Sequence, residues 1–468
     1  MKTTNKKILA AALLSASLVS TIVQGAGQPP PPGLIGKNGF LFLSYDISTS
    51  ADVPANNITI DLVTRLNKVL ASNGVTMAMV LVPMKMRIYS EFLPPTVRTN
   101  PTMMEQYDRT MKVFRTNHVN AIDLNTPFMD NANRNGPFPL HLKLDTHWSP
   151  SGVLLAAQTM KAGIDANPAL KKALDATPAV SYKLEISKQK KTNNSHDIVA
   201  LIPPAQQGKQ TFPPEDSLQF KVTRAQGEKS DLAPTTQPMP GVAIFGSSNS
   251  RPWTGFSDAL RYYLQRDILV SASNGDRGSW VGMESYLREA PFQTKPPKLL
   301  IFEMEERDLR SPPTFQHRAA NFNIDNTEWL LRVSALIQTS CKVSTVTARI
   351  APAGLGAVPS NQKGGGITTG PTSDTDFVDV VFSGPLGKLD YLWAKLPSSA
   401  SKPIILEASG SEAEARKFIT EATGAGALKY PLTSPGKGYT KVRIFPGKTT
   451  GFSLQDLQIC RQPDDLLS

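Results

Sequence analysis

The chain has 468 residues, a formal net charge of +11 and 40% hydrophobic residues, but only two cysteines. This length suits two or three domains, each large enough to bury its own core. The basic balance favours an anionic partner, with a merely solvated charged surface as the alternative. The lack of a basic helix interleaved with aromatic residues argues against nucleic-acid binding, and two cysteines without nearby histidines argue against a zinc site.

The N-terminus has the pattern of a secretory signal. Lys2, Lys6 and Lys7 precede the apolar stretch Ile8–Val23, which small residues follow. No later stretch approaches the ~18 to 20 apolar residues of a membrane span. We therefore expect residues 1–26 to be a signal peptide and the mature protein to be soluble in the periplasm. Retention as an uncleaved anchor is the alternative.

Strands and helices alternate over the next part of the chain. The apolar run Val75–Val82 predicts a strand buried on both faces, as in a parallel sheet covered by helices. We expect one α/β domain over residues 27–322, with an insertion at about 166–240 that is rich in Pro, Lys, Gln and Thr. Its other expected strands are Phe40–Leu43, Val119–Leu124, Gly241–Phe245, Asp267–Ala272 and Lys298–Met304, and its expected helices include Pro150–Ile164, Phe256–Gln265 and Ser279–Glu289.

From residue 323 to 468 the pattern changes to short β-rich runs, which predict an all-β sandwich. One helix is expected in it, opened by Ser411 with Glu414 in a capping-box arrangement. Cys341 and Cys460 lie near the two ends of this domain. Because an exported protein meets oxidising conditions, we predict a disulfide between them.

Asp145 and His147 are separated by one residue, in the segment Asp145-Thr146-His147-Trp148. In an extended segment, side chains two apart point the same way, so the carboxylate can hold the imidazole in one tautomer. Ser149 is expected to be the N-cap of the following helix, with Pro150 at its first position. The alternative is a structural ion pair in which a buried histidine is satisfied by a neighbouring aspartate.

The best partner for this histidine is the segment Gly246-Ser247-Ser248-Asn249-Ser250, which directly follows a predicted strand. A serine at the carboxyl end of a parallel strand is exposed at the sheet edge, and the backbone N–H groups after Gly246 can face an oxyanion. The alternative is an ordinary polar turn. A second loop carries Gly275, which permits close backbone approach, and Arg277, which can bind an oxyanion or a carboxylate.

Together these segments resemble the exported alginate O-acetyltransferases of the AlgX/AlgJ group, which are SGNH-hydrolase-like proteins. The resemblance rests on Gly36-Lys37-Asn38-Gly39-Phe40-Leu41-Phe42, Val82-Pro83-Met84-Lys85, Asp145-Thr146-His147-Trp148-Ser149, Gly246-Ser247-Ser248-Asn249-Ser250 and Glu303–Arg307. It implies an SGNH-like parallel sheet with permuted motif order, because Asp and His precede Ser, followed by a β-sandwich carbohydrate-binding module.

The resemblance also implies roles. Ser248 is the expected nucleophile, His147 the base and Asp145 the residue that orients His147, with Arg277 and Gly275 in the oxyanion or substrate site. The family motif reads Gly-Thr-Ser-aromatic, so Ser247 stays an alternative nucleophile. In the β module, Lys388, Trp393 and Lys395 are the expected polymer-binding residues, although Trp393 suits a core position equally well.

The expected activity is covalent acetyl transfer to an exported anionic polysaccharide, most simply alginate. A polysaccharide acetylesterase with the same triad and a non-catalytic polymer-binding scaffold are the alternatives. The sequence predicts no metal and no cofactor beyond an acetyl donor. Expected partners are the polymer and the membrane and periplasmic components of the acetylation and export machinery, and the protein itself is expected to be a monomer.

Overall fold

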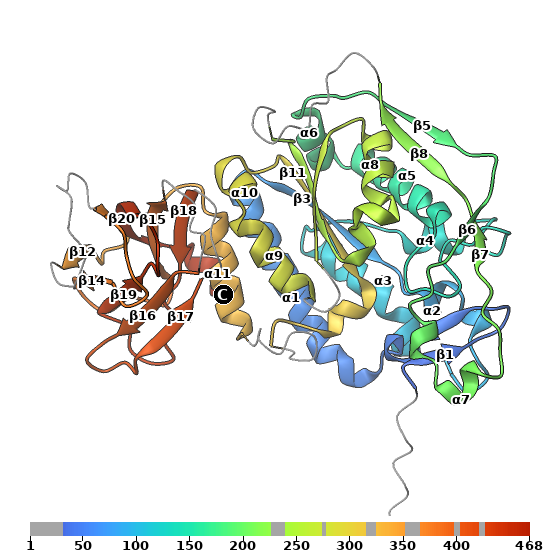
Figure 1. The fold of residues 1–468 in the computed structure, drawn as a ribbon, viewed down its shortest axis with the longest axis horizontal. Helices are drawn as coiled ribbons and strands as arrows, with labels where there is room; N and C mark the ends of the chain where they lie inside the picture. The colour runs from blue at the N-terminus through green and yellow to red at the C-terminus, as the bar shows by residue number, and fades with distance from the viewer. Residues whose placement is uncertain are drawn as a thin grey trace, which may run out of the picture.

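The computed structural model describes residues 31–225, 239–273, 278–314, 324–351, 366–396, 403–420 and 426–468. Within these ranges the chain forms an α/β domain and a C-terminal antiparallel β module, with helix α11 (Asn326–Ile337) beside the module (Figure 1). None of the described helices is long and apolar enough to span a membrane. The expected signal peptide lies outside the described residues.

The α/β domain is built on a five-stranded parallel sheet in the order β10-β9-β11-β3-β4. Because the strands are parallel, their carboxyl ends meet at one edge, where ligand sites of such sheets lie. These strands are β3 Thr76–Val82, β4 Asn120–Ile122, β9 Val242–Gly246, β10 Ile268–Ala272 and β11 Leu299–Glu305.

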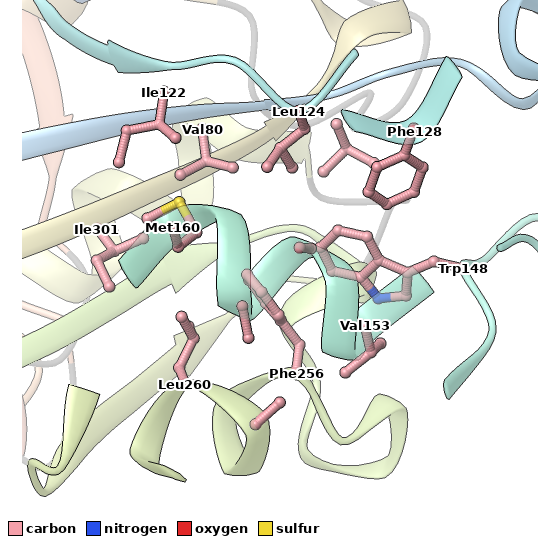
Figure 2. Packing of buried hydrophobic residues seen from close by; sticks show 14 of the residues in the cluster. Val80, Ile122, Leu124, Phe128, Trp148, Val153, Met160, Phe256, Leu260 and Ile301 are labelled. Carbon is pink, nitrogen blue, oxygen red and sulfur yellow. The ribbon is translucent and has the colours of Figure 1, made fainter. Parts of the chain in front are cut away.

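Side chains along each strand point alternately to the two faces of the sheet, and each face is covered by its own hydrophobic core. The unbroken apolar runs in the sequence predict this burial on both faces. In β3, Val80 belongs to one core and Met79 to the other. Helices α5, α6 and α8 cover the first face, and α1, α3, α9 and α11 cover the second. Figure 2 shows the first core, where the centroid of the Trp148 ring lies 4.5 Å from that of Phe256.

The described helices of the domain are α1 Val53–Ser72, α2 Lys85–Ile88, α3 Pro101–Thr116, α4 Asn125–Met129, α5 Pro150–Ala166, α6 Pro168–Asp175, α7 Pro204–Gln207, α8 Phe256–Leu264, α9 Gly278–Arg288 and α10 Ala290–Thr294.

The segment that the sequence marks as an insertion carries helices α6 and α7 and two small antiparallel pairs (Figure 1). One pair is β5 (Tyr182–Ile186) with β8 (Phe220–Arg224), and the other is β6 (Lys191–Asn193) with β7 (Glu215–Ser217). Near the start of the described chain, β1 (Gly33–Ile35) pairs with β2 (Leu41–Leu43). These elements lie outside the central sheet. Helix α6 and the start of β5 lie near the amino ends of β9 and β10, whereas Glu215 of β7 contacts Lys143 in the loop at the carboxyl edge.

The C-terminal module consists of two antiparallel sheets that enclose their own hydrophobic core. This agrees with the predicted all-β sandwich. Cys341 and Cys460 form the predicted disulfide. The first sheet contains β12 Ala348–Ala351, β14 Val378–Phe382, β19 Lys441–Phe445, β16 Ile405–Ser409 and β17 Arg416–Ile419, and the second contains β13 Ile367–Thr369, β20 Phe452–Arg461, β15 Asp390–Leu396 and β18 Gly426–Tyr430.

One local expectation is wrong, and one helix was not predicted. The segment that begins with Ser411 forms no helix, and the chain continues into strand β17, which pairs with β16 and buries Phe418. Helix α11 lies at the start of the region expected to be the β-sandwich, and no element was predicted for its residues. Asp325 caps it by accepting hydrogen bonds from the N–H groups of Thr327 and Glu328. Tertiary burial thus outweighs a capping pattern in the first case, and an unrecognised N-cap precedes a buried apolar helix in the second.

Helix α11 joins the two parts of the molecule. Its Trp329 is fully buried in the core of the α/β domain, while its Ala335 packs with Tyr391 and Cys460 of the C-terminal module. The module also contacts polar groups of the helix. Arg416 pairs with Glu328 at 2.9 Å, and Lys429 Nζ donates to the carbonyl oxygens of Leu336 and Gln338 at the helix C-terminus. A cation at that end also interacts favourably with the helix dipole. The domain boundary expected at residue 322 therefore comes before α11, although this helix packs in the core of the α/β domain.

A buried ion-pair cluster reinforces this junction. Glu284 on α9 contacts Arg288 and Arg332, and both guanidinium groups lie over the ring of Tyr430 in β18. Burial raises the pKa of Glu284, but the two arginines lower it more, so the net shift is downward. The cluster is therefore charged at neutral pH.

We expect Glu284→Gln to lower the free energy of unfolding by about 3 to 5 kcal/mol, because it leaves two guanidinium groups buried without a counter-charge. Since the pKa of Glu284 is depressed in the folded state, this contribution is present at neutral pH and is lost as the pH falls through that folded pKa. Urea denaturation measures the effect. Asp175→Asn, in an exposed pair with Lys171, serves as control and is expected to leave the midpoint unchanged. An unchanged midpoint for Glu284→Gln would contradict this account.

Candidate functional site

The nucleophile candidate lies where the sequence analysis expected it, in the turn after β9. Ser247 accepts a hydrogen bond from the N–H of Asn249 and thereby starts the short 3-10 turn Ser248–Ser250. Ser248 is half-buried, while Ser247 and Asn249 are buried. Only the hydroxyl of Ser248 among these residues therefore combines partial exposure with a place at the carboxyl edge of the sheet.

The histidine candidate lies in a loop that differs from the expected extended segment. Residues 143–147 form a series of bends, closed by a single bridge between His141 and Trp148. The expected helix start is present, because Ser149 caps α5 and Pro150 is its first residue. The bend, rather than strand geometry, turns Asp145 toward His147, whose own N–H also donates to the Asp145 carboxylate at 3.0 Å.

The structure brings Asp145, His147 and Ser248 together. His147 Nδ1 lies 2.6 Å from Asp145 Oδ1, and His147 Nε2 lies 2.9 Å from Ser248 Oγ. With its proton on Nδ1, the imidazole donates to the carboxylate and leaves Nε2 free to accept the serine O–H. This arrangement can deprotonate Ser248 for attack on a carbonyl group.

The charges around His147 favour its protonated form. Burial lowers the pKa of His147, but the hydrogen bond and charge of Asp145 raise it more, so the net shift is upward. For Asp145, burial raises the pKa, and the contacts with His147 lower it more, so that carboxyl stays ionised. An imidazolium formed during proton transfer is therefore stabilised.

Asp197, in the insertion, is a polar neighbour of the triad that no sequence pattern indicates. Its carboxylate accepts hydrogen bonds from the N–H and the hydroxyl of Thr146 and lies 3.9 Å from His147 Nδ1. Its own N–H donates to Asp145 Oδ2 at 3.3 Å. Asp197 thus braces the loop from outside, and no sequence motif marks it because its position depends on the fold of the insertion.

Glu303 fixes the nucleophile turn from beneath. This fully buried carboxylate accepts hydrogen bonds from the Ser247 N–H at 2.8 Å, from the Ser247 hydroxyl and from the Ser250 hydroxyl. Burial and the charge of Glu305 raise the pKa of Glu303 to about 7. Gly246 permits this approach, since a Cβ there would lie 2.4 Å from the Glu303 carboxylate.

Lys85 holds the histidine loop from the other side. Its buried ammonium donates to the carbonyl oxygens of Lys143 and Asp145 at 2.8 and 3.0 Å. The rings of Phe40 and Phe42 lie 5.6 Å from the same ammonium, a cation–π distance. The two sequence segments around Phe40 and Lys85 are thereby explained as supports of the Asp145–His147 loop.

One backbone donor at the site remains available for an oxyanion. The N–H groups of Ser247 and Asn249 already donate to Glu303 and to the Ser247 hydroxyl. Among the contacts of the described residues, the N–H of Ser248 donates to no acceptor. It is therefore suited to an oxyanion on the carbonyl that Ser248 attacks. Gly275 and Arg277, the other expected contributors, lie outside the described residues.

One set of side chains in the described part of the chain has the spacing of metal ligands. Ligand atoms of Asp145, His147 and Asp197 lie within 4.8 Å of one another. Hydrogen bonds already join these atoms to each other and to Thr146, as expected for a histidine held between carboxylates. The absence of a metal remains a prediction from the sequence.

The three expected polymer-binding residues of the β module have different surroundings. Lys388 is exposed in the loop before β15. Lys395 is also exposed and pairs with Asp456 at 2.5 Å. Trp393 is half-buried near the disulfide, and Lys429 Nζ lies 4.7 Å from its ring. Trp393 therefore packs at the junction with α11, which is the core-like alternative considered from the sequence.

Residues 34–306 match the family model described as SGNH hydrolase-like domain, acetyltransferase AlgX. Two similar proteins are each described as a probable alginate O-acetylase AlgJ. The one from Azotobacter vinelandii is 30% identical over 292 residues, which are 60% of this chain and 71% of the relative. The one from Pseudomonas fluorescens is 27% identical over 286 residues, which are 59% of this chain and 68% of the relative.

Two solved structures share the fold. Pseudomonas aeruginosa AlgX superposes with a TM-score of 0.60 at 16% identity and covers 92% of this chain and 94% of its own. The O-acetyltransferase domain of Pseudomonas putida AlgJ gives a TM-score of 0.53 at 20% identity, over 66% of this chain and 100% of that domain. The first likeness extends over most of the chain and so includes the C-terminal module.

We expect the rate of Ser248 acetylation to rise with pH through a midpoint above 6.5, because His147 acts as a base only when neutral and its pKa is raised from 6.5. Asp145→Asn removes the charge that raises this pKa, so the midpoint should move to lower pH while the plateau rate falls about 10⁴-fold. The pH profile of kcat/KM with 4-nitrophenyl acetate measures both effects. Asp197→Asn is the matched control, with a smaller shift in the same direction. A midpoint that rises in Asp145→Asn would refute the assignment.

We expect Gly246→Ala to lower kcat about 100-fold. The added methyl group would lie too close to the Glu303 carboxylate, so the carboxylate must move and the serine turn that it holds moves with it. Steady-state kinetics with a small acetyl ester measures this loss. Gly370→Ala, whose added Cβ has open space around it, is the control. Full activity in Gly246→Ala would show that the turn tolerates the displacement.

Proposed function

Since the chain belongs to the AlgX family of SGNH hydrolase-like acetyltransferase domains, we propose that it is an O-acetyltransferase that modifies exported alginate. The single observation that best supports the chemistry is the 2.9 Å contact between His147 Nε2 and Ser248 Oγ. The other ring nitrogen of His147 contacts Asp145 at the same time. A serine held in this way is suited to form an acetyl-enzyme intermediate.

In the first half-reaction, Ser248 Oγ attacks the carbonyl carbon of an acetyl donor while its proton passes to His147 Nε2. The tetrahedral oxyanion is held by the Ser248 N–H, with Gly275 and Arg277 as further proposed donors. The bond between the acetyl group and the donor's leaving group then breaks, and the leaving group takes the proton from His147. Acetyl-Ser248 remains. Asp145 keeps the imidazole oriented throughout and stabilises its charge.

In the second half-reaction, a hydroxyl group of the polymer loses its proton to His147 and attacks acetyl-Ser248. The new sugar ester forms, the bond to Ser248 Oγ breaks, and the proton returns from His147 to the serine. Transfer requires this sugar hydroxyl to outcompete water. The net charge of +8 that remains after removal of three signal lysines from +11 favours the approach of a polyuronate.

The setting follows from the same proposal. Residues 1–26 direct the protein to the periplasm as a signal peptide, and membrane and periplasmic components of the acetylation machinery supply the acetyl group. The protein works as a monomer, without a metal or cofactor beyond that donor. In the C-terminal module, Lys388 and Lys395 contribute positive charge to polymer binding, and Trp393 supports the strand that carries Lys395.

The decisive experiment follows acetyl groups by mass. After treatment of the mature protein with a small acetyl ester, we expect one added acetyl group on the peptide that contains Ser248, and acetyl transfer to added oligomannuronate. Ser248→Ala should lose both, whereas Ser247→Ala should keep transfer, although at a reduced rate because Ser247 caps the turn. This pair of variants also separates the two candidate nucleophiles.

Two results would replace this proposal by its alternatives. Hydrolysis of the ester without any acetyl gain on the oligosaccharide would identify an acetylesterase. Unchanged polymer acetylation in cells that carry Ser248→Ala would identify a non-catalytic scaffold.

A further inference from the structure

A groove of about 1090 Å³ opens beside the triad, between the insertion and the start of α8. Strands β5, β6 and β8 and the residues that join them form one wall. The other wall contains Trp148 and the turn Pro252–Gly255, which follows the nucleophile turn in sequence. A volume at or above the usual ~300–1,000 Å³ of ligand sites suits a chain of several sugar units rather than an acetyl group alone.

Trp253 stands at the end of this groove next to the histidine. Its side chain is 61% exposed, whereas Trp148, Trp280 and Trp329 are at most 6% exposed and Trp393 is half-buried. Its ring lies 4.7 Å from the His147 ring in an edge-on arrangement. A large apolar ring left in solvent beside a reactive group has the properties of a binding surface, because covering it with an apolar ligand face is favourable.

The turn that carries Trp253 is held by both walls. The Thr254 hydroxyl lies 2.8 Å from the carbonyl oxygens of Asn249 and Arg251, which ties the turn to the nucleophile segment. Gly255 adopts a left-handed conformation with φ of 81°, and Phe220 of β8 packs so closely on it that a Cβ would lie 2.8 Å from that ring. A fixed backbone at this turn lowers the entropy that is lost when the ring binds a ligand.

The rest of the groove offers groups that suit an acidic sugar. Its lining includes hydroxyl and amide side chains for sugar hydroxyl groups, and two exposed lysines, Lys191 and Lys221, for carboxylates. Of the groove's two acidic residues, Asp258 pairs with Arg261 at 2.5 Å. The other, Glu185, lies opposite Lys221 across the β5–β8 pair, so Lys191 is the lysine of the groove without an acidic residue opposite it. The lining hydroxyl and amide residues are Ser187, Thr192, Asn193, Asn194, Ser195, Ser217, Gln219 and Thr254.

We propose that this groove is the acceptor site, in which several units of a polyuronate chain lie along the insertion and the Trp253 ring stacks on the sugar whose hydroxyl faces His147. The flat ring would bury the apolar C–H face of that sugar while its hydroxyl groups contact the polar wall. This inference rests on the proposed function. It makes Trp253 a binding residue and gives the insertion a role in choosing the acceptor.

The first test locates binding without relying on activity. The mature protein with Ser248→Ala is labelled with 5-fluorotryptophan, which gives one ¹⁹F signal for each of the five tryptophans. The Trp253 signal is assigned from a Trp253→Phe variant. On titration with a mannuronate tetramer we expect this signal to shift, while those of the buried Trp280 and Trp329 stay unchanged. A shift confined to Trp393 would overturn the proposal, since binding would then lie in the C-terminal module.

The second test measures the acceptor in turnover. We expect Trp253→Ala to raise the acceptor KM about tenfold or more, a loss typical of one aromatic contact, with partial recovery in Trp253→Phe. Ile419→Ala, which alters a side chain 59% exposed on the C-terminal module, is the matched control. An acceptor KM in Trp253→Ala equal to that of the control would overturn the proposal.

Charge recognition is tested with two oligosaccharides. The double variant Lys191→Gln, Lys221→Gln should weaken binding of the mannuronate tetramer several-fold but should not change binding of neutral mannotetraose. Equal losses for both sugars would overturn the assignment of these lysines to carboxylates. A Trp253-dependent shift together with no acetyl transfer by the wild-type protein would overturn the proposed function and leave the groove standing. Acetyl transfer by the wild-type protein without a shift of the Trp253 signal would overturn the groove proposal and leave the proposed function standing.

Discussion

The carboxylates at the end of strand β11 are the constraint on which the candidate site depends. Glu303 binds the nucleophile turn, Glu305 accepts a hydrogen bond from Asn249 in the same turn, and Glu306 accepts from the N–H of Met84 and pairs with Arg87. Three acidic side chains in such a small volume are unfavourable unless each is hydrogen-bonded or paired. Their partners come from the ends of β9 and β3, so satisfying these charges brings the separate loops into one arrangement.

The histidine loop is held by a second set of buried polar contacts. Lys85, directly after β3, binds two carbonyl oxygens of that loop, and Asp197 binds its outer side. The imidazole is thus placed by the strand end, the loop itself and the insertion. Because reacting groups must be held to within a fraction of an ångström, such support from outside the triad is what the chemistry demands.

The insertion and the C-terminal module contribute in different ways. The insertion touches the catalytic loop through Asp197 and forms a wall of the groove that Trp253 borders. The module is attached to the far side of α11, through Lys429 and Arg416 and through the cluster around Glu284. Variation in the insertion therefore acts directly on the site, whereas the described contacts of the module lie at α11, away from the triad.

The sequence by itself determined the parallel sheet and the helix start at Ser149, because apolar runs and an N-cap are local patterns. It also determined the disulfide, because the chain has only two cysteines to pair, and the three residues that meet at the site, because their segments resemble the motifs of a known family. It did not reveal Asp197, the exposed ring of Trp253 or helix α11, and it predicted a helix at Ser411 where the chain enters a strand. Those features arise from contacts between segments that are far apart along the chain. Only the tertiary structure decides which polar groups are buried together, and burial is what gives a carboxylate, a lysine or a tryptophan its role.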